Sequence, residues 1–158
     1  MRSRVGGDVY EFLDQCVADV MSKPVTVGSE TTLAEVERLL EETGFNGLPV
    51  VDGGALVGFV TSLDLLKPLA TSDESLPPYE RVMAAPVTAV MTRDPDVVQP
   101  RTPLMRALEK MVATRNKSFP VVDPHGDRLV GVVAREDVMR ALRSADPSSP
   151  PAGAAPGA

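Results

Sequence analysis

Two polar residues three positions apart, Thr61 and Asp64, have the types and spacing needed to hold a phosphorylated sugar. They follow the apolar run LVGFV at 56–60 and stand where a helix is expected to begin, near Ser62. The free backbone N–H groups and positive dipole end of a helix start favour an anion, and the Thr61 hydroxyl adds a donor beside them. An ionised Asp64 can accept hydrogen bonds from two vicinal hydroxyls. The pair therefore predicts a site for a phosphate and a ribose.

The same pair has a second interpretation that needs no ligand. A Thr-x-x-Asp pattern at a helix start is also a capping box, and the cap contributes about 0.5–2 kcal/mol to helix stability. The chain repeats the pattern with Ala134 in place of the threonine, while Asp137 remains. A capping carboxylate has less reason to persist without its hydroxyl partner than a carboxylate that binds a ribose. The helix dipole favours an acidic first turn in either case, so both interpretations stay open.

The whole chain is built from two copies of one pattern. LVGFVTSLDLL (56–66) is repeated as LVGVVAREDVM (129–139), and ADVMSKPVTV (18–27) as TAVMTRDPDVV (88–98). The offset between the copies is 70 residues from Met21 to Met91 and 73 from Asp64 to Asp137, so they differ by small insertions. A repeat of this length is one folding unit used twice.

Each copy predicts the order strand, helix, strand, strand, helix. In the first, a strand at 24–27 precedes a helix that Thr32 and Glu35 begin with a capping box and Gly44 ends. Two strands then flank a tight turn at 52–54, and a second helix opens near Ser62. In the second copy, Thr102 caps a helix with Pro103 at its first position.

A single copy of about 55 residues buries too little apolar surface to be stable alone. The fold class expected is therefore α/β, of the α+β kind, with two β-α-β-β-α repeats packed against each other with pseudo-two-fold symmetry. The expected organisation is an N-terminal helical segment (1–16), a first repeat (17–69), a linker (70–86) with a helical turn at 78–83, a second repeat (87–144), and a disordered Pro/Ala/Gly tail (145–158). The spacing of apolar residues predicts a helix over 9–20.

These repeats resemble a tandem pair of cystathionine-β-synthase (CBS) domains, called a Bateman module. The resemblance covers Val17–Met139 and depends on VMSKPVTV (20–27), GFNGLPVVD (44–52) and GFVTSLD (58–64). It implies clefts between the repeats that hold adenosine ligands such as AMP, ADP, ATP, S-adenosylmethionine or cyclic dinucleotides. It also implies pairing into flat homodimers. In this family the residues that match Thr61 and Asp64 bind phosphate and ribose.

The base of such a ligand is expected against the first strand of a repeat and the residues that lead into the second strand of that repeat. Arg115, Lys117 and Arg135 place three cations near the second site, where the hydroxyl is missing, and could hold a polyphosphate by charge. The plainer alternatives are ordinary core for the apolar residues and solvated surface for the cations. The candidate ligand-binding residues are Val25, Thr26, Val27, Phe45, Asn46, Gly47, Leu48, Pro49, Thr61, Ser62, Asp64, Lys117, Ser118, Phe119, Pro120, Arg135 and Asp137.

Composition excludes several other classes of protein. The net charge of −6 disfavours binding to nucleic acid or an anionic membrane, and no apolar run approaches the roughly 20 residues of a membrane span. The one cysteine, Cys16, and the one histidine, His125, cannot form a disulfide or a zinc site, so a cytoplasmic location is expected.

No motif of a nucleophile, a phosphate-binding loop or a zinc protease is present, so no enzyme activity and no required cofactor are expected. The function predicted is regulation through an adenosine ligand, with an unknown protein target. The alternative is a structural dimerisation or interaction module whose clefts stay empty.

Overall fold

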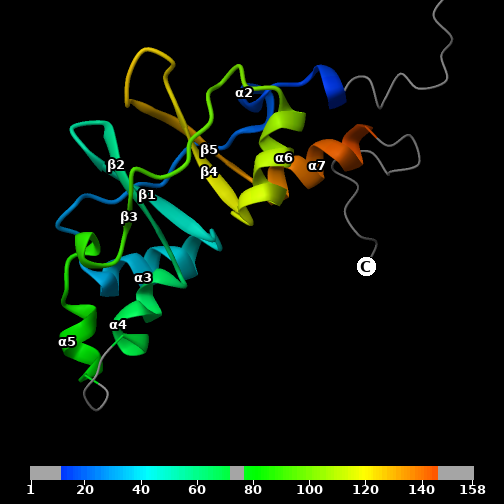
Figure 1. Ribbon diagram of the computed structural model, residues 1–158. Helices are drawn as coiled ribbons and strands as arrows, with labels where there is room; N and C mark the ends of the chain where they lie inside the picture. Colours follow the sequence, from blue (N-terminus) through cyan, green and yellow to red (C-terminus); the bar gives the residue numbers. More distant parts are fainter. Residues whose placement is uncertain (1–11, 72–76, 146–158) are drawn as a thin grey trace, which may run out of the picture.

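The computed structural model describes residues 12–71 and 77–145 and has a mixed α/β fold in two halves (Figure 1). Each half contains a β-hairpin with a helix before it and a helix after it, as the repeat predicts. The elements of the first half are α3 (Leu33–Thr43), β1 (Gly47–Asp52), β2 (Ala55–Thr61), the 3₁₀ turn η1 (Asp64–Leu66) and α4 (Lys67–Ala70). Those of the second are α6 (Leu104–Thr114), β4 (Ser118–Val122), β5 (Leu129–Ala134) and α7 (Arg135–Ala145).

The two hairpins have the same register and the same irregularity. In β1–β2, Leu48 pairs with Val60, and a register shift follows at Val50/Val51. In β4–β5, Phe119 pairs with Val133, and the shift follows at Val121/Val122. The alternation of apolar residues in both copies thus produces one hairpin geometry twice.

The expected first strand of each repeat is not a strand in the structure. Residues 24–27 contribute a single parallel bridge, Val27 to Val50, and the second copy contributes the equivalent bridge, Val98 to Val121. The prolines in PVTV and DPDVV have no N–H to donate, which limits the ladder that these short segments can form. The prediction of a strand at 24–27 is therefore wrong, although the segment lies beside β1 through this bridge.

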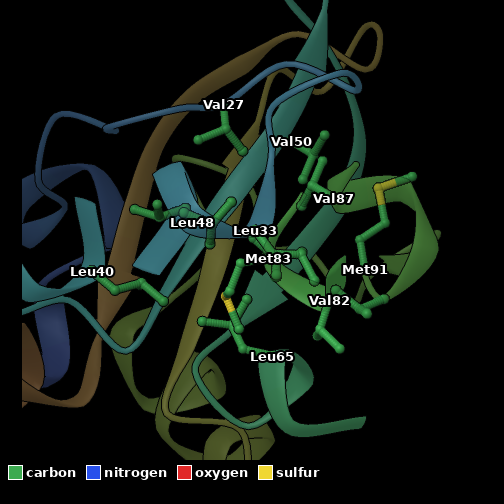
Figure 2. Close-up of a cluster of buried hydrophobic side chains, with 13 residues drawn as sticks. Val27, Leu33, Leu40, Leu48, Val50, Leu65, Val82, Met83, Val87 and Met91 are labelled. Carbon is green, nitrogen blue, oxygen red and sulfur yellow. The ribbon is translucent and has the colours of Figure 1, made fainter. Parts of the chain in front are cut away.

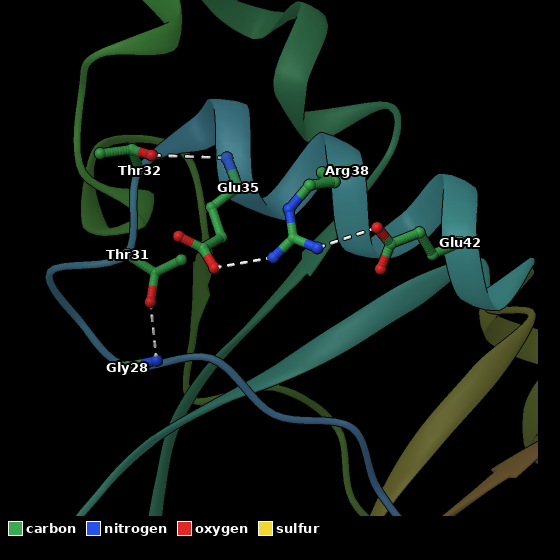
Figure 3. Close-up of polar contacts among 6 residues, drawn as sticks. All are labelled: Gly28, Thr31, Thr32, Glu35, Arg38 and Glu42. Atoms are coloured by element: carbon green, nitrogen blue, oxygen red, sulfur yellow. Dashed lines mark hydrogen bonds and ion pairs between the residues drawn. The ribbon is translucent and has the colours of Figure 1, made fainter.

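Helix α3 has the predicted ends, but its capping box is only half formed. The Thr32 hydroxyl accepts a hydrogen bond from the Glu35 N–H at 3.4 Å (Figure 3). The chain leaves the helix at Gly44 with φ 71°. The Glu35 carboxylate does not return to the cap. It binds the Arg38 guanidinium at 2.9 Å, and Arg38 also binds Glu42 at 2.9 Å. Exposed i,i+3 and i,i+4 pairs of this kind stabilise a helix by a few tenths of a kcal/mol each.

The start of α6 also differs from the prediction. Pro103, not Thr102, stands at the N-cap, without a side-chain cap. The Thr102 hydroxyl accepts from the Gln99 N–H at 3.0 Å, as Thr31 accepts from Gly28 at 3.0 Å in the first half. Thr102 thus closes the turn before the helix.

The segment that opens each repeat packs against the other repeat. Residues of α5 (Tyr79–Met83), η2 (Val87–Ala89) and Met91 join Leu33, Leu48 and Val50 in the core of the first half (Figure 2). Phe12 and Val17, the latter in α2 (Val17–Val20), join the core of the second half. The short strand β3 (Thr92–Arg93) extends the first hairpin, and Ser22 forms the equivalent bridge with Val132. The two halves are thus interlocked, which the sequence did not predict.

The repeated glycine of LVGFV and LVGVV is explained by this exchange. A Cβ on Gly58 would lie 2.5 Å from Met91 Sδ and 3.0 Å from the Thr92 carbonyl oxygen. A Cβ on Gly131 would lie 2.7 Å from Met21 Sδ and 3.2 Å from the Ser22 carbonyl oxygen. Each glycine therefore lets the opening segment of the other repeat approach the hairpin.

The helix expected over 9–20 is interrupted. Residues 12–14 are helical, the helix breaks at Gln15 and Cys16, and α2 follows. The break occurs because Gln15 and Val17 form backbone hydrogen bonds with Leu104 and Thr102, at 3.0 and 2.9 Å. The helical turn expected at 78–83 is confirmed by α5. The calls on 1–11 and on the tail after residue 145 fall outside the described residues.

Candidate functional site

Two cavities lie between the halves, and each takes residues from both repeats. The Asp137 cavity, about 270 Å³, combines Ala134 and Asp137 of the second repeat with Val25 and Phe45 of the first. The Asp64 cavity, about 540 Å³, combines Thr61 and Asp64 of the first repeat with the second repeat's 114–118 and 94–96. The carboxylate of each repeat therefore faces the strand opening of the other repeat, that is, the residues just before and at the start of β1 or β4.

Asp64 is buried, with 6% of its surface exposed, and both of its carboxylate oxygens are engaged. Oδ2 accepts from the Thr61 N–H at 2.8 Å and from the Thr61 hydroxyl at 3.1 Å. Oδ1 pairs with Lys67 Nζ at 2.6 Å, and Lys67 also donates to the Val90 carbonyl at 3.2 Å. The capping role proposed as the alternative is present in the structure.

Asp137 has the same arrangement without the threonine. It is 5% exposed, and its Oδ2 accepts from the Ala134 N–H at 2.8 Å. Its Oδ1 accepts from the Ser22 hydroxyl and pairs with Arg140, both at 3.2 Å. The carboxylate caps its helix through the backbone alone, so the argument that a cap loses its purpose without the hydroxyl is wrong.

The three cations expected at one site lie in different places. Arg115 and Lys117 line the Asp64 cavity, where the hydroxyl is present, and not the cavity of Ala134. Arg135 lines neither of the two cavities and pairs with Glu136 at 3.2 Å. The expectation that charge replaces the missing hydroxyl at Ala134 is therefore not supported by the geometry.

Twelve of the predicted site residues line a cavity. Those at the Asp137 cavity are Val25, Phe45, Asn46, Gly47, Pro49, Ser118 and Asp137. Those at the Asp64 cavity are Asn46, Thr61, Ser62, Asp64, Lys117, Ser118 and Pro120. Asn46 and Ser118 line both cavities; Asn46 directly precedes β1, and Ser118 is the first residue of β4.

The other predicted residues line neither cavity. Val27, Leu48 and Phe119 are 5%, 0% and 0% exposed and belong to the two hydrophobic cores. Thr26 and Arg135 also lie outside the lining of both cavities. The alternation of a strand explains the core residues, since every second side chain points away from the cavity.

Sequence reasoning missed residues that follow the repeated methionine. Ser22 and Lys23 line the Asp137 cavity, and Thr92 and Asp94 line the Asp64 cavity. Their signal was available in part, because Ser22 and Thr92 stand at matched positions directly after Met21 and Met91. It was not recognised because the exchange of opening segments between halves is not visible in the repeat.

Glu136 adds a second carboxylate to the Asp137 cavity. Burial alone would raise its pKa, but hydrogen bonds from its own backbone N–H, from Arg135 and from Asn46 outweigh burial and hold the pKa below its usual value. The equivalent position at the Asp64 cavity is the apolar Leu63. The two cavities therefore differ in chemistry at several matched positions.

Comparison with known proteins identifies the architecture. A family model described as CBS domain matches residues 17–71 and 87–144. The chain belongs to the CBS domain family. Its relatives include an uncharacterized protein of Methanocaldococcus jannaschii, 29% identical over 80% of this chain and 90% of that protein. A CBS domain-containing protein of Dictyostelium discoideum is 33% identical, again over 80% and 90%.

Some relatives are enzymes, and this chain matches only a small portion of their length. The L-aspartate semialdehyde sulfurtransferase of M. jannaschii is 32% identical over 78% of this chain but only 22% of the enzyme.

Two similar solved structures contain adenosine compounds. The structure of CBSX2 in complex with AMP has a TM-score of 0.68 and 30% identity, and the match covers 80% of this chain and 94% of that one. The CBS domain pair of protein MJ0100 in complex with 5-methylthioadenosine and S-adenosyl-L-methionine has a TM-score of 0.67 and 32% identity, with the same coverage.

Within residues 12–71 and 77–145, no helix has the length and apolar character needed to cross a bilayer. In the same residues, no group of three or more His, Cys, Asp or Glu side chains is placed to hold a metal ion.

Proposed function

We propose that this CBS pair is a regulatory module that binds adenosine ligands in its two cavities. The observation that carries the proposal is the pairing, in each cavity, of a buried aspartate from one repeat with the strand openings of the other. CBS pairs of similar structure contain AMP, 5-methylthioadenosine and S-adenosylmethionine. The proposed function requires no cofactor, no catalytic residue and no metal.

The ribose is assigned to Asp64 in one cavity and to Asp137 in the other. In each, one carboxylate oxygen caps the helix and the other faces a side-chain cation, Lys67 or Arg140, three residues along. A ribose can compete for that second oxygen because Lys67 and Arg140 are half exposed or more and can move into solvent. The base is assigned to Val25 and Phe45 in the Asp137 cavity.

Binding would be transmitted by the exchanged segments. Lys67 joins Asp64 to the carbonyl of Val90, which belongs to the opening segment of the second repeat. A ligand that displaces Lys67 removes this link and changes how the repeats pack, to the extent that its affinity differs between the two arrangements. The module is proposed to act as a cytoplasmic homodimer on an unknown protein target.

The test is a melting experiment on the full chain with AMP, ADP, ATP, S-adenosylmethionine and a cyclic dinucleotide. A ligand at 100 times its dissociation constant adds about 2.7 kcal/mol and raises the melting temperature by several degrees. Asp64→Ala and Asp137→Ala should each lower the free energy of unfolding of the unliganded chain by about 1–2 kcal/mol, because each substitution removes one helix cap. Each should also remove the ligand shift that depends on its own cavity.

A second candidate function is an interaction module that binds no ligand. The specific observation in its favour is that both carboxylates are already satisfied by their own helix starts and neighbouring cations. This function is supported if no adenosine compound shifts the melting temperature at millimolar concentration while the chain is dimeric in solution.

A further inference from the structure

Arg115 ends α6 in a backbone conformation that favours glycine. Its φ and ψ are 60° and 18°, and the equivalent residue after α3, Gly44, has 71° and 10°. A Cβ makes this left-handed region unfavourable, which is why glycine usually ends a helix in this way. Arg115 and Asp94 are the two non-glycine residues with positive φ in the described ranges 12–71 and 77–145, and both line the Asp64 cavity. The unfavourable geometry is concentrated at one site.

Two cations in the lining of the Asp64 cavity, Arg115 and Lys117, are available to bind an anionic ligand. Asp64 pairs with Lys67, and Asp96 lies 4.0 Å from Lys110. Within the described residues, neither Arg115 nor Lys117 forms an ion pair, and Asp94 is the remaining carboxylate of the lining. A guanidinium and an ammonium that share one cavity lining, and that form no ion pair among the described residues, are suited to phosphate oxygens.

The Asp64 cavity also differs from the Asp137 cavity in its hydroxyl groups and its volume. The Asp64 cavity has Thr61 and Ser62 in its lining and a volume of about 540 Å³. The Asp137 cavity has Ala134 and Glu136 at positions equivalent to Thr61 and Leu63, and a volume of about 270 Å³. Its cations are Lys23 and Arg140, and Arg140 is paired with Asp137. The matched positions to Arg115 and Lys117 are Gly44 and Asn46, neither of which carries charge. The smaller cavity therefore offers a phosphate chain fewer donors.

We propose that the Asp64 cavity selects adenosine ligands with two or three phosphates and that Arg115 is the residue that sets this selectivity. The Asp137 cavity takes adenosine ligands that lack a phosphate chain. This inference rests on the proposed function and deepens it. The left-handed arginine lowers the stability of the fold and places a cationic residue in the lining of the cavity.

The test compares ATP with adenosine by calorimetric titration of the full chain, in the parent and in Arg115→Gly. Because glycine removes both the backbone penalty and the cation, we expect a melting temperature about 1–4 °C higher. We also expect ATP affinity to fall about tenfold or more and adenosine affinity to change less than twofold. Arg115→Asn, which tolerates the left-handed region, should lose ATP affinity to the same degree. Arg143→Gln, on the exposed face of α7 and outside both linings, is the charge-matched control and should change neither affinity.

Three results would overturn the proposal. An unchanged ratio of ATP to adenosine affinity in Arg115→Gly shows that the arginine only ends the helix, and leaves the proposed function intact. Loss of the ratio in Lys23→Gln, but not in Arg115→Gly, assigns the phosphates to the Asp137 cavity. If neither ATP nor adenosine binds the parent chain, the proposed function fails and this inference fails with it.

Discussion

The two halves of the molecule are alike in the residues that interlock them and different in the residues that face the cavities. Both have a glycine against the other half's methionine, at Gly58 and Gly131, and both have an aspartate that caps the last helix. They differ where Thr61 is replaced by Ala134 and where Gly44 is replaced by Arg115. The comparison teaches that the shared residues maintain one packing arrangement, while the changed residues give each cavity its own chemistry.

The closing helices of the two repeats differ in form but keep a matched packing contact. Pro68 stands where Ala141 stands in α7, and because proline has no N–H to donate, no hydrogen bond runs from residue 68 back to Asp64. The chain after Asp64 is a 3₁₀ turn followed by the four-residue α4, whereas α7 continues for 11 residues. Leu65 and Val138, at equivalent positions, are both buried. The core contact is thus kept although the helix is shorter.

The largest effect should come from the matched core residues Phe119 and Leu48. Phe119→Ala is expected to lower the free energy of unfolding by about 3–5 kcal/mol and Leu48→Ala by about 2–5 kcal/mol, because both side chains are fully buried. Chemical denaturation of the full chain measures both. A loss below about 1 kcal/mol, together with loss of ligand binding, would show that these residues contact ligand instead of forming core.

A smaller effect should come from the exchanged segments. Gly131→Val and Gly58→Val are each expected to lose about 1–3 kcal/mol, because the new side chain meets Met21 or Met91. Combining Gly131→Ala with Met21→Ala should recover part of what the glycine substitution alone loses, measured as a double-mutant cycle. Gly126→Ala is the control, since nothing lies within 4 Å of its Cβ position. Equal losses at Gly126 and Gly131 would contradict the interlocking of the halves.

The smallest effect should come from making the two caps alike. Thr61→Ala leaves the hydrogen bond from its backbone N–H to Asp64 intact and removes only the hydroxyl contacts, so about 0.5–1 kcal/mol should be lost. Ala134→Thr should gain a few tenths of a kcal/mol at the other cap. Thermal melts of the unliganded proteins measure both changes. If Thr61→Ala destabilises as much as Asp64→Ala, the hydroxyl carries the cap and the backbone contact does not.

Local features of the fold were predictable because the residues that make them are close in the chain. Thr32 and Gly44 set the ends of α3, and the apolar alternation around Asp52–Gly54 set the first hairpin. The same kind of local signal identified four of the candidate site residues. Asp64 and Asp137 stand at a fixed distance after the repeated LVG motif, and Asn46 and Ser118 stand just before the prolines of β1 and β4. The assignment of Arg115 and Lys117 to the Ala134 site failed because it paired residues within one repeat.

What the sequence by itself determined was the repeat, its two hairpins, the ends of α3 and the positions of the two aspartates, because periodicity, capping and turn chemistry act over a few residues. Only the tertiary structure decided which aspartate meets which strand openings. The opening segment of each repeat packs on the other half, and such long-range burial leaves no pattern within a single repeat. The cavities are therefore a consequence of the interlocking, and their differing charges follow from which residues it brings together.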